Sequence, residues 1–139
     1  KDEMLENTQT MPEEPGAYED QLAWGTARFS ATSSIMFRMR DFSEPVTLFG
    51  QDQILMGRSE PGSEGEIGLD LSLYDAAEQG VSRRHAMIRR GEDTLMLLDL
   101  GSTNGTFLNG QRLPPQQPRV LRDGDEIRLG RLVMRVFFR

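Results

Sequence analysis

The chain has 139 residues with 16 basic and 22 acidic side chains, a formal net charge of −6 at pH 7. This length suffices for one domain with a single core and a tail, and no apolar run approaches the roughly 18 to 20 residues that a membrane span needs. With no cysteine and one histidine, disulfide scaffolds and cysteine-ligated metals are excluded. We therefore expect a soluble protein without a metal or other cofactor.

Residues 1–30 are expected to form a flexible acidic tail. They hold seven acids and two bases, together with prolines, glycines and few branched apolar residues, so they cannot bury enough surface to offset the entropy lost on ordering. The alternative is a short helix in which Tyr18, Leu22 and Trp24 pack together. The chain opens without the basic and apolar regions of a secretory signal, which favours a cytoplasmic location.

From residue 34 onward the chain has the pattern of short strands. Alternation places Ile35, Phe37 and Met39 on one face of the first strand. Nine further runs follow, at residues 46–49, 53–56, 66–69, 86–89, 95–98, 106–108, 119–121, 126–129 and 132–138. Asn-Gly, Asp-Gly and Pro-Gly turns separate several of them. Ten or eleven short strands with close turns predict a two-sheet antiparallel β-sandwich. The one helix candidate, residues 71–79, is expected to be a loop insertion.

Two segments crowd polar residues at the ends of predicted strands, where loops can present them without disturbing the core. Residues 80–86 read Gly-Val-Ser-Arg-Arg-His-Ala, and residues 101–110 read Gly-Ser-Thr-Asn-Gly-Thr-Phe-Leu-Asn-Gly. A Gly-Arg pair at 57–58 precedes them, and a turn-rich strand pair at 121–130 follows them. In this order and spacing, the four pieces resemble the forkhead-associated (FHA) domain. The resemblance covers roughly residues 34–139.

This resemblance implies both a fold and a function. FHA domains are eleven-stranded β-sandwiches that bind phosphothreonine peptides through the loops at one end. We therefore expect an all-β, SMAD-like sandwich of about eleven strands over residues 31–139, preceded by the tail of residues 1–30. The implied function is that of a non-enzymatic, phosphothreonine-dependent binding module in serine/threonine-kinase signalling, in the manner of a small bacterial FHA regulator.

The resemblance assigns roles to five residues of the binding site. Arg58 and Ser82 match the family's phosphate-binding arginine and serine, and Thr103 matches a hydroxyl position at the phosphate. Asn104 matches the asparagine that holds the peptide backbone, and Arg83 occupies a position that contacts peptide or phosphate. The residue types agree with this, because phosphothreonine carries close to two negative charges and needs donors that keep their protons.

Five further residues are expected to shape the binding loops without touching the ligand: Gly57, His85, Gly105, Asn109 and Gly110. In the family the histidine braces the loop behind the serine. An Asn-Gly pair suits a two-residue hairpin turn. A metal-binding role for the histidine is disfavoured, because a solitary imidazole makes a poor metal site.

The implied partners are proteins or peptides that contain phosphothreonine, with a serine/threonine kinase as one source. The chain's own tail is another, since Thr8 and Thr10 are candidates for phosphorylation followed by docking into the site. No nucleic-acid partner is expected, because the chain lacks the basic excess that drives such binding. Membrane insertion is not expected either.

Two other functions stay open at this point. Ser82, His85 and Asp99 can be interpreted as a hydrolase triad, although the Gly-x-Ser-x-Gly elbow is missing. An FHA fold can also serve as a scaffold or assembly domain that binds partners independently of phosphorylation, through a face of the sandwich instead of the loops.

Overall fold

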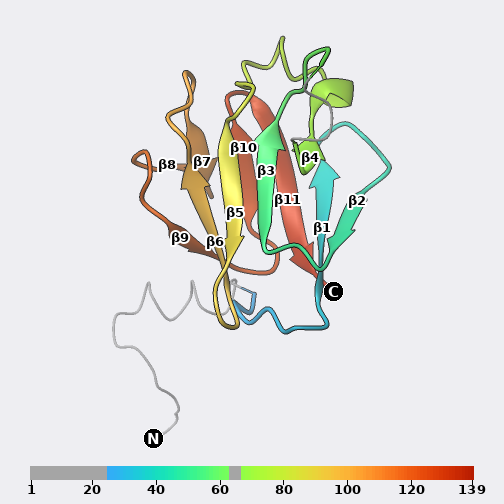
Figure 1. Cartoon of the computed structure of the whole chain (residues 1–139), viewed down its shortest axis with the longest axis vertical. Helices are drawn as coiled ribbons and strands as arrows, with labels where there is room; N and C mark the ends of the chain where they lie inside the picture. The colour runs from blue at the N-terminus through green and yellow to red at the C-terminus, as the bar shows by residue number, and fades with distance from the viewer. Residues whose placement is uncertain (1–24, 63–66) are drawn as a thin grey trace, which may run out of the picture.

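The structure is a computed structural model, and it describes residues 25–62 and 67–139. This part of the chain folds into eleven strands, arranged as two sheets that face each other (Figure 1). In chain order the strands are β1 (Ser34–Met39), β2 (Val46–Phe49), β3 (Gln53–Gly57), β4 (Leu69–Asp70), β5 (Ala86–Arg90), β6 (Leu95–Asp99), β7 (Thr106–Leu108), β8 (Gln111–Arg112), β9 (Arg119–Leu121), β10 (Glu126–Leu129) and β11 (Leu132–Phe138).

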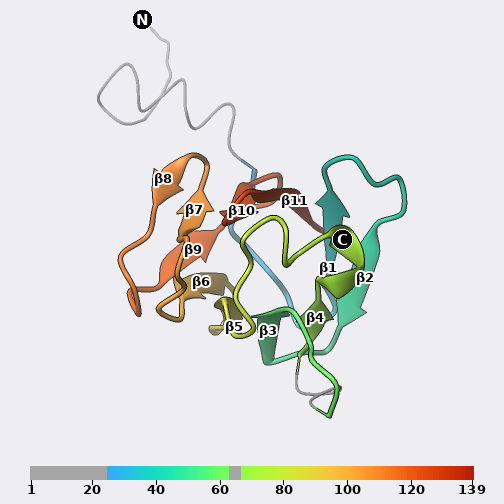
Figure 2. The same ribbon diagram turned by 90° about the horizontal axis from the view of Figure 1, so that it is seen from above.

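One sheet has six strands in the order β2-β1-β11-β10-β7-β8, and the other has five in the order β4-β3-β5-β6-β9. All pairs are antiparallel except the short β3–β4 pair, which is parallel. Figure 2 shows the two sheets as separate layers when the sandwich is viewed from above. The predicted β-sandwich is thus confirmed. Within the expected loop insertion of residues 71–79 the chain forms a 3₁₀ turn, η1 (Ser72–Tyr74), instead of an α-helix.

The core lies between the sheets and follows the alternation seen in the sequence. In β11, Met134 and Val136 are at most 1% exposed, whereas Arg135 between them faces solvent. Phe37 of β1 and Leu97 of β6 are fully buried from opposite sheets. Each such side chain contributes roughly 1.5 to 3 kcal/mol on burial. Because a slip of one residue would turn these side chains outward, the core also fixes the strand register.

The chain between residues 25 and 30 runs along the end of the sandwich where β11 finishes. The Phe29 side chain is 4% exposed, and its ring meets that of Phe138 edge-on at 5.2 Å between centroids. The Thr26 carbonyl accepts a hydrogen bond of 2.8 Å from the backbone N–H of Asp123. Phe29 therefore belongs to the core, while the expected domain boundary after residue 30 stays a prediction.

Residues 1–24 and 63–66 lie outside the described residues. Two predictions concern residues in the first of these ranges: the phosphorylation of Thr8 and Thr10, and the alternative helix formed by Tyr18, Leu22 and Trp24. Within the ranges that the structure describes, no helix is long and apolar enough to cross a membrane.

Candidate functional site

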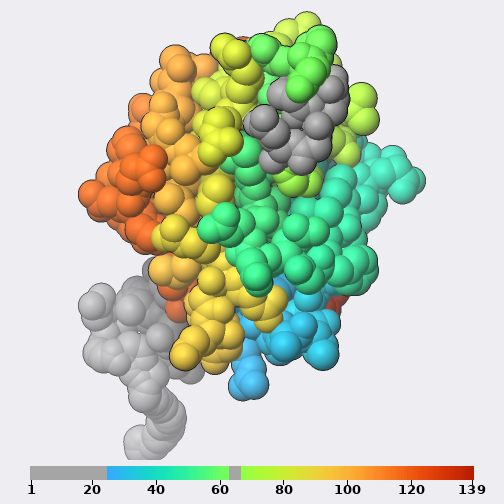
Figure 3. All heavy atoms as spheres, in the orientation of Figure 1, coloured from blue at the N-terminus to red at the C-terminus, as the bar shows by residue number. Residues whose placement is uncertain are grey.

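Three loops meet at the end of the sandwich opposite the C-terminus (Figure 1). They follow β3, precede β5 and follow β6. Because β5 runs antiparallel to both of its neighbours, the end of β3, the start of β5 and the end of β6 lie at the same edge. Figure 3 shows the green, yellow and orange segments of these loops gathered along the upper rim of the molecule. The topology thus brings together the segments that carry the predicted site residues.

Arg58 follows β3 and is held from two sides. Its Nε donates a hydrogen bond of 2.7 Å to the carbonyl of Val81, and its Nη1 lies 3.7 Å from the Glu60 carboxylate. The same carboxylate lies 3.3 Å from Nη1 of Arg83. The Arg58 side chain is 31% exposed and that of Arg83 65%. Two permanently charged guanidinium groups therefore flank one carboxylate at the rim of the loops.

Hydrogen bonds from Thr103 and Asn104 help to join the loop before β5 to the loop after β6. The Thr103 backbone N–H donates to Ser82 Oγ at 3.4 Å, and Asn104 Nδ2 donates to the carbonyl of Gly80 at 3.0 Å. A Cβ on Gly80 would lie 2.7 Å from Asn104 Nδ2, so a side chain there would displace the amide. Because the Ser82 hydroxyl accepts in its bond, its own hydrogen can still be donated.

Gly57 permits the close approach of β3 to the loop that carries Ser82. A Cβ at this position would lie 1.9 Å from the backbone oxygen of Arg83. Any side chain would therefore push the two loops apart. The resemblance assigns this glycine a supporting role, and the structure shows the backbone contact that requires it.

His85 is fully buried behind the loops and connects them. The Ser82 backbone N–H donates to Nδ1 at 2.9 Å, and Nε2 lies 2.9 Å from the carbonyl oxygen of Gly105. Since a backbone N–H can only donate, Nδ1 carries no hydrogen, and Nε2 donates to Gly105. Burial lowers the pKa of His85, and the opposing effects of the Gly105 carbonyl and the Asp99 carboxylate do not restore it to 6.5.

This neutral histidine makes the stability of the domain depend on pH. Because the folded-state pKa lies below 6.5, the unfolded chain takes up a proton first as the pH falls. The stabilisation is therefore complete above about pH 6.5, the unfolded-state pKa, and is lost as the pH falls through the folded-state pKa. Thermal unfolding measured from about pH 7.5 to 5 should show a steeper loss of stability for the wild type than for His85→Gln.

The buried or hydrogen-bonded carboxylates Asp70 and Asp99 cannot account for the difference in pH dependence between the wild type and His85→Gln. Asp70 and Asp99 both have pKa values lowered from 3.8, so they titrate below the pH range of the measurement. Parallel pH profiles for the wild type and His85→Gln would contradict the assignment of a neutral His85 as the connection between the loops.

Asp99 at the end of β6 organises the loop that carries Thr103. Its carboxylate is 2% exposed. Oδ1 accepts hydrogen bonds from the hydroxyls of Ser102 at 2.5 Å and Thr106 at 2.6 Å, and Oδ2 accepts from the backbone N–H groups of Gly101 at 2.9 Å and Ser102 at 3.2 Å. Burial raises the pKa of Asp99, but these four bonds lower it by more. An ionised buried carboxylate thus fixes the loop.

A second carboxylate, Asp70, plays a similar part beside Arg58. Its Oδ1 accepts from the backbone N–H of Ser59 at 3.2 Å, and from the N–H and hydroxyl of Ser72 at 3.0 and 2.7 Å. Ser59 follows Arg58 directly, so this cluster fixes the chain that leaves β3. Neither Asp70 nor Asp99 is among the supporting residues predicted from the sequence. An aspartate ahead of glycine or serine at a strand end is the available signal, since such aspartates bond to backbone two residues on.

Asn109 and Gly110 lie at the other end of β7 from the loops, in the turn to β8. Asn109 Nδ2 donates to the carboxylate of Asp125 at 3.0 Å, and its Oδ1 accepts from the backbone N–H of Glu126 at 2.9 Å. The structure thus connects this pair to the start of β10, whereas the other predicted supporting residues sit beside the site.

The residues of the alternative hydrolase triad do not form the required chain of hydrogen bonds. The backbone N–H of Ser82, not its hydroxyl, bonds to His85. The Asp99 carboxylate is bonded by Ser102 and Thr106 instead of the imidazole. These three residues therefore do not form the hydrogen-bonded chain of nucleophile, base and orienting acid that a hydrolase triad requires.

Comparison with known proteins gives one family. The FHA domain model matches residues 54–130. An oxoglutarate dehydrogenase inhibitor of Corynebacterium jeikeium is 47% identical over 62 residues, which are 45% of this chain and 39% of that protein. The chain therefore spans less than half of that relative.

Two solved structures share the fold and part of the sequence. One, from a study of phosphothreonine-dependent FHA domain interactions, is 32% identical with a TM-score of 0.59, over 75% of this chain and 95% of that one. The FhaA FHA domain, solved in complex with the intracellular domain of Rv3910, is 32% identical with a TM-score of 0.58, over 74% of this chain and 99% of that one.

Proposed function

This chain belongs to the FHA domain family, and we propose that it is a non-enzymatic module that binds phosphothreonine-containing proteins in serine/threonine-kinase signalling. One observation carries the proposal: three loops place Arg58, Ser82, Thr103 and Asn104 at one end of the sandwich and are hydrogen-bonded to one another.

The donors at this end suit a phosphate dianion. Val81 holds Arg58 through Nε, so the guanidinium is a fixed cation whose Nη1 already lies 3.7 Å from an anionic group, the Glu60 carboxylate. The hydroxyls of Ser82 and Thr103 add donors, and charge-assisted bonds of this kind are roughly twice as strong as neutral ones. The Glu60 carboxylate lies between Arg58 and Arg83, which shows that this position favours an anion. A phosphate group carries more negative charge and more acceptor oxygens than a carboxylate, so it would bind the two arginines more strongly.

Asn104 is proposed to hold the peptide backbone beside the phosphorylated residue, and Arg83 to supply a second positive charge. Neither role requires a catalytic group or a cofactor. We place the module in the cytoplasm, where intracellular kinase domains meet their substrates. A kinase or a protein that it has phosphorylated is then the expected partner.

The chain's own phosphorylated tail is a second source of ligand. The described chain begins at the end of the sandwich opposite the loops (Figure 1), so Thr10 must pass the length of the sandwich to reach Ser82. The length of the sandwich can be taken from its longest strand: the seven residues of β11 span about 24 Å. The 15 residues from Thr10 to Gly25 span about 50 Å when fully extended, so the tether is longer than this distance.

The test is a degenerate peptide library with a fixed central residue, presented as phosphothreonine, phosphoserine or threonine. We expect the phosphothreonine form to bind and the threonine form not to bind. The phosphoserine form should bind about 10- to 200-fold more weakly than the phosphothreonine form, because one methyl group is worth about 1 to 3 kcal/mol. Titration calorimetry on the selected peptides gives the affinities.

Ser82→Ala is the matched variant, since it removes one hydroxyl and keeps the backbone N–H that bonds to His85. Its affinity for the phosphothreonine form should fall. Equal binding of all three library forms would contradict the proposal and favour the phosphorylation-independent scaffold. Equal binding of the two phosphorylated forms would contradict only the expected preference for phosphothreonine over phosphoserine.

A further inference from the structure

The outer face of the six-stranded sheet is rich in arginine. Strand register places the side chains together: Arg38 lies opposite Arg135, and Phe107 lies opposite both Arg128 and Arg112. We call the following set the arginine face: Arg38, Arg40, Arg112, Arg128 and Arg135. Within its strands, the outer face of the five-stranded sheet carries one arginine, Arg89, among mainly apolar residues.

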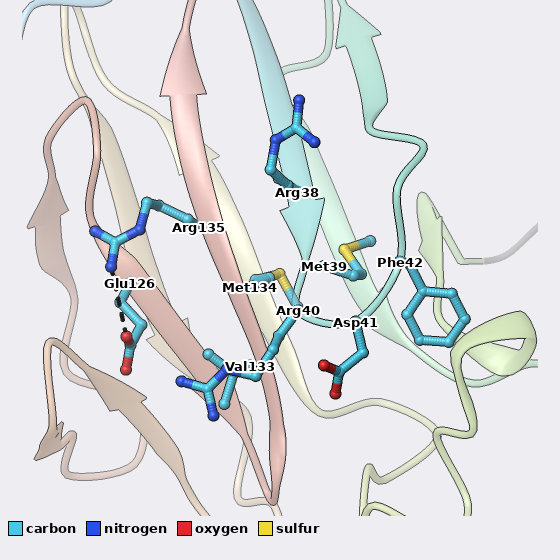
Figure 4. Close-up of a pocket in the computed structure, with 9 residues that line it drawn as sticks. All are labelled: Arg38, Met39, Arg40, Asp41, Phe42, Glu126, Val133, Met134 and Arg135. Carbon is cyan, nitrogen blue, oxygen red and sulfur yellow. Dashed lines mark ion pairs between the residues drawn. The ribbon is translucent and has the colours of Figure 1, made fainter.

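Three members of the arginine face, Arg38, Arg40 and Arg135, line one cavity of about 320 Å³. Figure 4 shows their guanidinium groups at separate points around it, on side chains that come from β1, from the residue after it and from β11. Two carboxylates also line the cavity, those of Asp41 and Glu126. Only Glu126 makes an ion pair that Figure 4 marks, at 3.7 Å from Arg135. Cations therefore outnumber anions here.

The facing pair Arg38 and Arg135 is unfavourable for the sheet itself. Like charges directly opposite each other on neighbouring strands destabilise a sheet. Arg135 is paired with Glu126, and Arg38 Nη1 donates to the carbonyl of Ser43 at 3.3 Å. Both positions are exposed, so the core does not require arginine at either. Arg135 Nη1 also donates to the carbonyl of Gly124 at 2.6 Å. Two facing arginines on an exposed strand pair still break a local rule of sheet stability, which is typical of a functional surface.

The remaining arginines are fixed against an aromatic ring. The Arg128 guanidinium lies 3.7 Å from the centroid of Phe107 and that of Arg112 lies 5.8 Å from it. Half-buried apolar side chains, Val133 and Phe137, lie on the same face between the cations. The surface is thus both cationic and apolar, and it is held in place before any ligand arrives.

The chain carries a segment of complementary chemistry. Residues 1–24 hold seven acids and one base, a net charge of −6, whereas residues 25–139 hold 15 of each. The same segment contains apolar side chains, including Met11, Tyr18 and Leu22. We propose that the acidic segment of residues 1–24 docks along the arginine face of its own domain, without phosphorylation.

The point at which this segment joins the domain favours that surface. The backbone N–H of Asp123 donates to the Thr26 carbonyl, and the Asp123 carboxylate accepts from the N–H of Phe138 at the end of β11. Figure 2 shows the first described residues, in blue, beginning beside β10 and β11. Arg135 lies three positions before Phe138 along β11, a distance of about 10 Å.

The acids are within reach of the arginines. Asp20 lies five residues before Gly25 and Glu13 lies twelve before it, which corresponds to about 16 to 40 Å of extended chain. A tether of this kind gives an effective concentration in the millimolar range. Even weak ion pairs then keep the segment bound, and the phosphopeptide loops at the other end of the sandwich stay uncovered.

The experiment uses the full chain with a nitroxide at Ala17→Cys, a substitution that keeps every acid. Because the chain has no other cysteine, the label attaches at one position. We expect paramagnetic broadening of the amide signals of residues 36–40 and 133–135. Raising the ionic strength from about 0.1 M to 1 M shortens the screening length from about 10 Å to 3 Å and should abolish the broadening.

Two charge-reversal variants complete the test. Arg38→Glu with Arg40→Glu should remove the broadening, because both residues belong to the arginine face. Arg84→Glu with Arg89→Glu makes the same change in net charge elsewhere and should leave it intact. Broadening confined to residues near Asp123, broadening centred on the loops, or broadening that survives the first pair or high salt would overturn the proposal.

Discussion

Replacement of Arg58 by alanine is expected to weaken binding of a phosphothreonine peptide by about 2 to 4 kcal/mol, roughly 30- to 700-fold. The substitution removes a guanidinium that the backbone carbonyl of Val81 holds in place at the binding loops. A phosphate docked between the loops would then keep hydroxyl donors but lose its fixed cation. Titration calorimetry of the wild type and the variant measures the difference.

Two matched variants separate charge from position. Arg83→Ala removes an equal charge from a side chain that is 65% exposed, where an ion pair is worth only about 0.2 to 1 kcal/mol. Glu60→Gln removes the carboxylate that lies against both arginines and should strengthen phosphopeptide binding. Wild-type affinity in Arg58→Ala, with an unchanged melting temperature, would exclude the proposed phosphate site.

Much of the fold was predictable because its cause is local. Alternating burial along β1 and β11 is visible as alternating residue type, and glycine turns mark where the strands end. The contribution of Phe29 was not predictable in this way. It sits in a stretch whose composition is acidic and whose burial depends on Phe138, more than a hundred residues away. No local pattern reports such a contact.

The same distinction applies to the site. Residues that touch the ligand in the family were recognised by their motif, and His85 was expected to brace the loop. The geometry adds what a motif cannot contain: the imidazole accepts from one loop and donates to the other. Glu60 was not predicted to lie between Arg58 and Arg83, since that arrangement arises from the fold of two separate loops.

The arginine face could not be predicted from the sequence at all. Its members lie on four strands and in the turn after β1, between residues 38 and 135, and nothing in their spacing relates them. Sheet order places β1, β11, β10, β7 and β8 side by side, and register then aligns the arginines in rows. A chain with a net charge of −6 therefore presents a cationic surface that its overall composition conceals.

The largest loss of stability is expected from Asp99→Ala, on the order of 3 to 5 kcal/mol. The substitution leaves the fully buried hydroxyl of Thr106, the hydroxyl of Ser102 and two backbone N–H groups without their acceptor. Each buried donor that loses its partner costs about 1 to 3 kcal/mol, and bonds to a charged acceptor are the stronger ones. Urea unfolding at neutral pH measures the change.

Asp99→Asn keeps the shape of the side chain and tests the charge. Its Oδ1 can still accept from Ser102 and Thr106, but its Nδ2 would face two backbone N–H groups, so we expect a smaller loss of about 1.5 to 3 kcal/mol. Because the pKa of Asp99 is lowered in the folded state, its stabilisation is complete above the unfolded-state pKa of about 3.9 and is lost as the pH falls through the folded-state pKa. Both variants should therefore lose less stability than the wild type below about pH 4. Equal acid sensitivity in all three proteins would show that the bonds from Ser102 and Thr106 do not stabilise the ionised carboxylate.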